Sequence, residues 1–198
     1  MTLTRRTCLK AAAAAALMAT FPLSSLAADV AGVKFDDTAT VGGQSLKLNG
    51  AGVRTKVIFK VYALGLYLPE KKTTVADVLA SQGARRTQIV FMRELTSEEF
   101  GQAFMNGLTS NTNEAERNKL LPQTKQFGEL FASIPSVKKG DVLTVDWIPG
   151  TGTQCMLNGK KVGEVLPDLA FYNAILRIWL GDKPADSSLK AAMLGESK

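Results

Sequence analysis

Histidine is absent from the 198-residue sequence, and this absence removes many kinds of chemistry. Without it there is no Ser-His-Asp or Cys-His triad, no HExxH zinc site and no histidine-ligated haem. Of the two cysteines, Cys8 lies near the N-terminus and Cys155 stands alone in the rest of the chain. A lone cysteine without a histidine to activate it is predicted to be a small, half-buried apolar residue and not a nucleophile.

The acidic residues do not indicate a metal site. Asp36-Asp37, Glu98-Glu99 and Glu114/Glu116 fall at turns or expected helix starts, where solvation and the helix dipole account for them. Gly150-Thr151-Gly152 lacks the residues that complete a phosphate-binding loop and is predicted to be a turn. We therefore expect neither a metal nor a cofactor.

Residues 1–27 are predicted to be a signal peptide of the twin-arginine type, which places the protein in the periplasm. Arg5-Arg6 and Lys10 precede a short alanine-rich apolar stretch that ends in Ser25-Leu26-Ala27, a small-x-small cleavage sequence. The alternatives are a Sec signal, a buried N-terminal helix and an uncleaved anchor. Residues 28–198 are predicted to form one domain, and no apolar run reaches the roughly 18–20 residues of a membrane-spanning helix.

The composition further narrows the class of protein. With 45% apolar and 21% charged residues the chain does not have the composition of a disordered protein. The whole chain carries 24 basic and 18 acidic side chains, a net charge of +6. Three of the basic residues and none of the acidic ones lie in 1–27, so the remainder has 21 basic against 18 acidic, or +3. Since no basic stripe is visible either, we do not expect a nucleic-acid partner.

Strand-like segments dominate the first half of the remaining chain. Short β-like runs at 30–35 and 38–48 lead to an expected turn at 49–52. The run from Val53 to Leu68 is rich in β-branched and aromatic residues and is interpreted as one long stretch of strand. From Tyr62 onward it is apolar on both faces, which predicts burial on both sides.

Helices are more frequent later in the chain. A capping box at Thr96–Glu99 opens a helix with Phe100, Phe104 and Leu108 on one face, and Asn158-Gly159 indicates a hairpin. This grouping of strands and helices, without strict alternation, predicts an α+β fold with a largely antiparallel sheet. The other expected elements are helices at 75–81, 114–134 (with a kink or new first turn at Pro122), 167–179 and 186–195, and strands at 88–92, 141–147, 153–157 and 160–165.

One stretch of the sequence has a pattern that is typical of a known family. It consists of Leu48-Asn49-Gly50-Ala51-Gly52-Val53-Arg54 followed by Phe59-Lys60-Val61-Tyr62-Ala63-Leu64-Gly65-Leu66-Tyr67-Leu68-Pro69. This pattern resembles the signature of the chalcone isomerase superfamily. Lys139-Gly140-Asp141, the Asn158-Gly159 hairpin and Ile178-Trp179-Leu180-Gly181 follow in the same order. The combination is most similar to the bacterial exported chalcone isomerase-like branch. It implies an open-faced, largely antiparallel sheet packed against a layer of helices.

The resemblance to the isomerases is weak at the catalytic positions. The family's arginine corresponds to Arg54 and its threonine to Tyr62, and these two are the candidate catalytic residues. The family's tyrosine falls on Phe100, its asparagine on Gly107 and its late hydroxyl residue near Arg177 or Ile178. Since each lost donor toward developing charge costs about 10²–10³ in rate, efficient chalcone cyclisation is not expected.

The fatty-acid-binding branch of the superfamily is more similar. Its members hold a carboxylate with an arginine and a tyrosine at the mouth of an apolar cleft, and the resemblance assigns these roles to Arg54 and Tyr62. A guanidinium presents a planar fork to two carboxylate oxygens, and a phenol adds a further donor. Phe100, Phe104 and Asn106 are the other candidate ligand-binding residues.

The spacing of Arg54 and Tyr62 sets a condition on this hypothesis. Eight residues along one straight strand would separate the pair by roughly 26 Å, so the chain must bend or reverse between them. The expected place of the reversal is Arg54-Thr55-Lys56.

Three functions therefore remain open. The leading hypothesis is a periplasmic protein that binds a small amphipathic or aromatic ligand, in particular a carboxylate such as a fatty acid, in an apolar cleft. The second is an isomerase (intramolecular lyase) that acts on a flavonoid-like or other enone. The third is a partner-binding module of the cell envelope whose cleft is closed by side chains.

Overall fold

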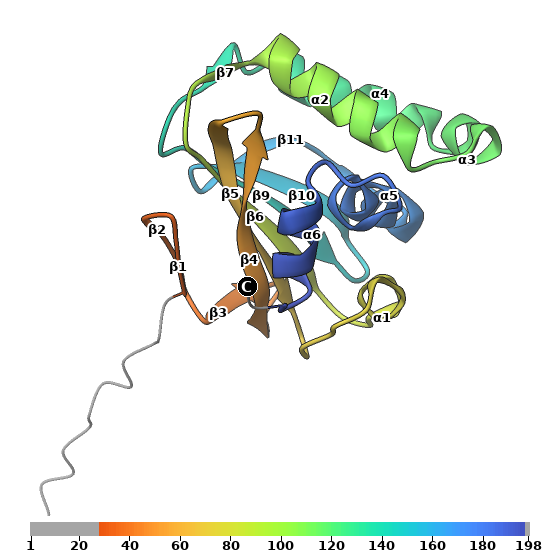
Figure 1. Cartoon of the computed structure of the whole chain (residues 1–198). Coiled ribbons are helices and arrows are strands. Elements are labelled where there is room, and N and C mark those ends of the chain that lie inside the picture. The colour runs from red at the N-terminus through yellow and green to blue at the C-terminus, as the bar shows by residue number, and fades with distance from the viewer. Residues whose placement is uncertain (1–27, 197–198) are drawn as a thin grey trace, which may run out of the picture.

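The sheet at the centre of the protein is antiparallel throughout and curled, with every helix on one of its faces (Figure 1). The computed structural model describes residues 28–196, so the predicted signal peptide lies outside the described residues. The seven strands follow in space as β11 (Lys160–Leu166), β10 (Gly152–Leu157), β9 (Val142–Ile148), β6 (Arg85–Phe91), β5 (Phe59–Leu68), β4 (Gln44–Lys56) and β3 (Thr38–Val41). Two further pairs are β1 (Ala28–Val30) with β2 (Val33–Phe35), and β7 (Leu95–Thr96) with β8 (Ser136–Val137).

Side-chain caps mark the start of most helices. The predicted capping box is present, with the Thr96 hydroxyl accepting from the Glu99 N–H and the Glu99 carboxylate accepting from the Thr96 N–H. No helix in residues 28–196 is long and apolar enough to cross a membrane. The helices are α1 (Val75–Ala80), α2 (Ser97–Ser110), α3 (Glu114–Lys119), α4 (Leu121–Ala132), α5 (Leu169–Leu180) and α6 (Ser187–Met193).

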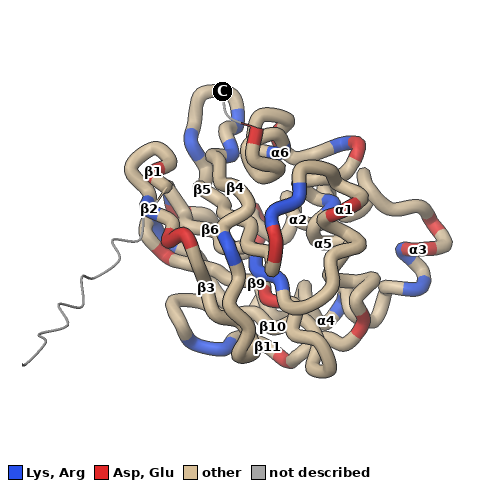
Figure 2. Tube along the Cα trace, turned by 90° about the horizontal axis from the view of Figure 1, so that it is seen from below, with Lys and Arg blue, Asp and Glu red and all other residues tan. Residues whose placement is uncertain are grey.

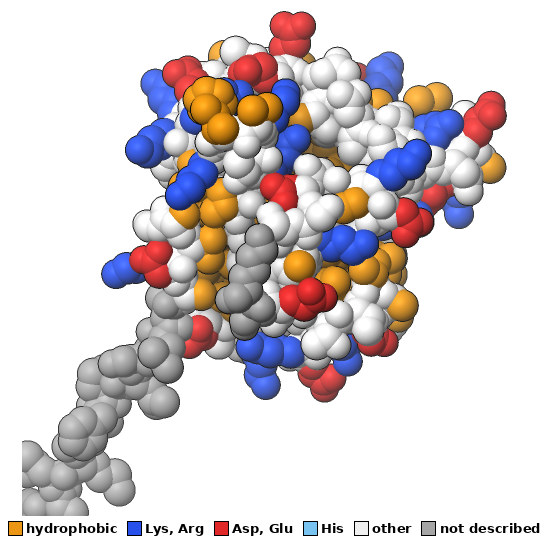
Figure 3. Space-filling view, viewed as in Figure 1, with side chains coloured by type: hydrophobic (Ala, Val, Ile, Leu, Met, Phe, Trp, Pro, Cys, Tyr) orange, Lys and Arg blue, Asp and Glu red, His pale blue; other side chains and the backbone are white. Residues whose placement is uncertain are grey.

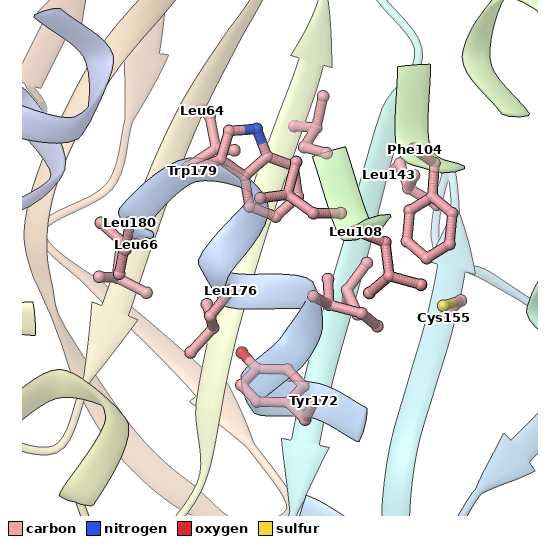
Figure 4. Close-up of a cluster of buried hydrophobic side chains, with 14 of the residues drawn as sticks. Leu64, Leu66, Phe104, Leu108, Leu143, Cys155, Tyr172, Leu176, Trp179 and Leu180 are labelled. Atoms are coloured by element: carbon pink, nitrogen blue, oxygen red, sulfur yellow. The ribbon is translucent and has the colours of Figure 1, made fainter. Parts of the chain in front are cut away.

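The sheet is buried on both faces where β5 passes through it. Leu64, Leu66 and Leu68 point to the main core under the helices, as the packing beside α5 in Figure 4 shows for the first two. Ala63 and Tyr67 point to a smaller core on the opposite face, which the N-terminal strands cover. The predicted burial of this segment on both sides is confirmed, and the α+β class with an antiparallel sheet is confirmed with it.

The expected turn at 49–52 is wrong, because these residues lie inside β4. Gly50 and Gly52 permit α6 to pack directly on the strand: a Cβ at Gly50 would lie 2.0 Å from the Ala192 carbonyl oxygen. Asn49 is buried, and its amide donates to the Met193 carbonyl at 2.7 Å and to the Lys72 carbonyl at 2.9 Å. The residues that suggested a turn therefore serve a close contact between strand and helix.

The single long strand expected over 53–68 is also wrong, because the chain reverses at Val57-Ile58. This two-residue turn joins β4 to β5 and pairs Lys56 with Phe59. The reversal lies just beyond the expected Arg54-Thr55-Lys56. It puts Arg54 directly opposite Tyr62 in the antiparallel register.

Smaller differences concern element ends. The strand expected at 88–92 begins at Arg85. The new first turn expected at Pro122 is confirmed, because the helix expected over 114–134 divides at Leu120 and Pro122 lies in the first turn of α4. The helix expected from Pro167 begins one residue after Asp168, whose carboxylate caps it at the Ala170 N–H. The Asn158-Gly159 hairpin is confirmed. The helix expected at 186–195 is present as α6, and the Asp186 carboxylate caps it at the Ser188 and Leu189 N–H groups.

Candidate functional site

The β4–β5 hairpin brings Arg54 and Tyr62 together on the face of the sheet that the helices cover. Gly50, Gly52 and Arg54 follow one another on that face of β4, so α6 packs on the glycines and Arg54 emerges just beyond it. The Arg54 guanidinium carbon lies 5.6 Å from the centre of the Tyr62 ring. The reversal of the chain that their spacing in the sequence required is therefore present, because Arg54 and Tyr62 pair across the two strands of the hairpin.

A cavity of about 540 Å³ opens between this hairpin and the helices. Its volume falls within the roughly 300–1,000 Å³ of ordinary small-molecule sites. All five residues predicted to bind a ligand line it: Arg54, Tyr62, Phe100, Phe104 and Asn106. They come from β4, β5 and α2, and only the fold places them around one space.

The Tyr62 hydroxyl is held by a partner that the sequence did not reveal. The Trp179 indole N–H of α5 donates to it at 2.7 Å, and both side chains are buried. Since this bond uses the oxygen as acceptor, the hydroxyl hydrogen stays free to donate, and no acceptor for it occurs among residues 28–196. Burial raises the pKa of Tyr62 above its usual value, while Arg54 and the Trp179 hydrogen bond act in the opposite direction. Tyr62 is therefore a neutral hydrogen-bond donor at pH 7.

Arg54 has donor capacity that the protein does not use. Its Nε is buried and has no hydrogen-bond partner in the described part of the chain. Removing a guanidinium N–H from water without giving it a hydrogen-bond partner costs free energy. An anionic oxygen in the cavity would supply that partner through a charge-assisted hydrogen bond. The candidate anion site is therefore the space bounded by Arg54 and Tyr62.

The rest of the cavity is largely apolar. Phe100 and Phe104 of α2 stack with Phe131 of α4, with ring centres 4.6 Å and 6.4 Å away respectively. Phe127 packs against Phe104 at 4.6 Å. Phe127 and Phe131 lie in the helix expected over 114–134, and no signal in the sequence linked them to the cavity. The remaining apolar lining comes from Val61, Ile89, Leu95, Leu143, Val145, Ile175, Ile178 and Trp179.

Polar residues form the rim. Asn106 is exposed and accepts from the Gln102 amide at 2.9 Å, while Arg93 pairs with Glu99 at 3.3 Å. Lys56 and Lys183 also border the cavity, so the rim carries more positive than negative charge.

At the positions that the resemblance assigns to the other catalytic groups of the isomerases, the side chains are apolar or bound elsewhere. Phe100 has no hydroxyl, and a side chain at Gly107 would meet Ile178, its Cβ lying 2.6 Å from the Ile178 Cγ2 atom. Arg177 is bound to Glu116 of α3. The cavity is therefore lined by the Arg54 guanidinium and the Tyr62 hydroxyl, and Phe100 and Gly107 add no side-chain donor.

Two other expectations about reactive groups can be compared with the structure. Cys155 was expected to be a half-buried apolar residue, and it is in fact fully buried in the main core, which Figure 4 shows in part. Burial raises its thiol pKa to about 12. Among the described residues no group of three or more acidic or cysteine side chains is placed to hold a metal ion.

Comparison with known proteins agrees with this architecture. A family model described as chalcone isomerase-like matches residues 27–195. The crystal structure of a fatty-acid binding protein from Arabidopsis thaliana superposes with a TM-score of 0.64 at 18% identity, covering 82% of this chain and 92% of the plant protein. No curated protein matches the sequence. The curled antiparallel sheet with its layer of helices is the chalcone isomerase-like fold, and the chain belongs to the chalcone isomerase-like family.

Proposed function

We propose that the protein binds a small amphipathic carboxylate, such as a fatty acid, and does not cyclise chalcones efficiently. In this proposal it belongs to the bacterial exported branch of the family and works in the periplasm after twin-arginine export. The carboxylate lies between Arg54 and Tyr62, and the acyl chain lies among the phenylalanines of α2 and α4.

The observation that carries the proposal is the unused Nε of Arg54 beside the free hydroxyl hydrogen of Tyr62 at an apolar cavity. An arginine fork and a phenol match the two oxygens of a carboxylate. The structural relative from Arabidopsis thaliana is a fatty-acid binding protein, which supports the same ligand class. The open cavity argues against a partner-binding module whose cleft is filled by side chains.

The absence of further donors argues against the isomerase hypothesis. An enone acceptor needs several groups aimed at its developing charge, and each one missing costs about 10²–10³ in rate. Phe100 and Gly107 offer none. We expect no efficient turnover of chalcones by residues 28–198, and efficient turnover of an enone that Tyr62→Phe abolishes would instead establish the enone isomerase.

The test compares binding of a fatty acid and of the matching fatty alcohol. Calorimetric titration of delipidated residues 28–198 with palmitate and with hexadecanol measures both affinities. We expect Arg54→Ala to weaken palmitate binding about 10- to 100-fold, the value of a hydrogen bond to a charged group, and to leave hexadecanol binding unchanged. Lys160→Ala, at an exposed lysine away from the cavity, is the matched control. Equal palmitate affinity in Arg54→Ala and the native protein would refute the carboxylate anchor.

The proposed location has its own test. Replacing Arg5 and Arg6 together by lysine in the full chain should leave the precursor uncleaved in the cytoplasm, because twin-arginine transport requires the paired arginines. Fractionation with immunoblotting gives the result, and normal export of the double variant would argue for a Sec signal.

A further inference from the structure

The tip of the β4–β5 hairpin is the most exposed apolar feature of residues 28–196. Val57, Ile58 and Phe59 are 89%, 78% and 60% exposed. They form an orange cluster where the hairpin ends at the upper left of Figure 3. Leu121 and Met105 are the other large exposed apolar side chains, and each lies on a helix of its own. Consecutive exposed apolar residues at a turn need a reason, because turns ordinarily carry polar residues or glycine.

The backbone at the tip is strained at Val57. Val57 has φ of +60°, a conformation that β-branched residues rarely adopt and that glycine would adopt without cost. A strained valine in the core could be explained by packing. At an exposed turn no packing repays the strain, so the apolar side chain itself is the feature to be explained.

The charged side chains of the hairpin itself are all basic, and the Asp186 carboxylate accepts from the Thr55 N–H below the tip. From Val53 to Val61 the hairpin carries Arg54, Lys56 and Lys60 and no acidic residue. Figure 2 shows basic positions on both arms of the projecting hairpin. Apolar side chains flanked by lysines fit the interface of a bilayer, where the lysines meet anionic headgroups and the apolar groups enter the acyl boundary.

The hairpin also connects the tip to the candidate site. Lys56 borders the cavity, and the two strands that end at the tip carry Arg54 and Tyr62. We propose that the Val57-Ile58-Phe59 tip inserts into an anionic phospholipid surface and so presents the mouth of the cavity to the bilayer. This inference rests on the proposed function, since a bilayer is the source or destination of a fatty acid.

A second copy of the chain is a less suitable occupant. A stable protein interface buries roughly 800 Å² on each partner, and three side chains at a two-residue turn present less than that. A convex tip has no pocket with which to grip a partner, whereas a bilayer deforms around it.

The test is co-flotation of ligand-free residues 28–198 with vesicles of phosphatidylcholine alone or mixed with phosphatidylglycerol. We expect Ile58→Asp to lower partitioning about 10- to 100-fold, which corresponds to withdrawing one buried isoleucine side chain. Leu121→Asp, at an apolar residue of similar exposure, should change nothing. Lys60→Ala should lower binding about 5-fold in the mixed vesicles only, because one lysine near an anionic surface contributes about that factor.

Several results would overturn the inference. These are the absence of vesicle binding, unchanged binding by Ile58→Asp, and equal losses in Ile58→Asp and Leu121→Asp. Self-association of the native protein that Ile58→Asp abolishes, measured by sedimentation, would show that a second copy covers the tip. Palmitate affinity in solution should be the same in Ile58→Asp and the native protein. Vesicle binding without palmitate binding would refute the proposed function and leave the docking tip in place.

Discussion

Two arginine–tyrosine pairs lie on the helix-covered face of the sheet. Arg54 is 5.6 Å from the ring centre of Tyr62, and Arg85 is 5.2 Å from that of Tyr172. Both guanidinium groups have buried N–H donors without partners among residues 28–196. The residue types, the distance between guanidinium and ring, and the unpartnered donors do not distinguish the two sites.

Their surroundings differ. Arg85 is fully buried, and its Nη1 donates to the Val78 and Leu79 carbonyls near the end of α1 and to the Asn173 side chain at 3.0 Å. It joins α1, β6 and α5 and does not border the cavity, whereas Arg54 does. An unpartnered donor therefore indicates a ligand site only where a ligand can reach it.

The largest expected effect separates the two arginines by stability. Arg85→Ala should lower the free energy of unfolding by about 3–5 kcal/mol, because it leaves a cavity and unpaired carbonyls in the core. Arg54→Ala should cost less than about 1 kcal/mol, since Arg54 is only half-buried and makes few contacts that stabilise the fold. Urea unfolding of both variants measures the difference. Similar losses in the two would mean that Arg54 is also structural.

The two tyrosines give the next largest contrast. Tyr62→Phe should cost about 1–2 kcal/mol, because it leaves the buried Trp179 N–H without its acceptor. Tyr172→Phe should cost close to nothing, because the Tyr172 hydroxyl is buried without a partner in the described structure. Thermal unfolding of the paired variants tests this. A clear loss in Tyr172→Phe would indicate a water bound at that hydroxyl.

A smaller effect tests the geometry of the anion site. Arg54→Lys keeps the charge and loses the planar fork, so palmitate affinity should fall about 3- to 10-fold, less than in Arg54→Ala. The same calorimetric titration measures it. Full affinity in the lysine variant would show that charge alone holds the ligand.

A separate prediction concerns a pH dependence of stability that all three tyrosines share. Burial raises the pKa of Tyr62, Tyr67 and Tyr172, that of Tyr67 to about 12, against about 10 in the unfolded chain. Their contribution to stability is therefore complete below pH 10 and falls as the pH rises from 10 toward 12. At pH 10.5 absorbance at 295 nm should show almost no tyrosinate in the native protein and most of it in urea. Native tyrosinate at that pH would contradict the burial of these rings.

Much of the fold could be predicted from local patterns. The capping box at Thr96, the Asn158-Gly159 hairpin and the apolar stretch after Tyr62 each depend on neighbouring residues, and each is confirmed. The prediction of a turn at Asn49-Gly50-Ala51-Gly52 failed because glycines usually mark turns. Here they make room for α6, a helix more than 130 residues later in the chain. The turn at Val57-Ile58 was not predicted, because valine and isoleucine are typical of strands.

The sequence by itself determined the class of fold, the family and the residue types available for binding, because these follow from local periodicity and from an order of motifs along the chain. Only the tertiary structure decided that Arg54 faces Tyr62, that Trp179 holds the Tyr62 hydroxyl, and that Arg54 and not Arg85 reaches a cavity. Register, burial and access depend on contacts between segments far apart in the chain. No local pattern encodes them.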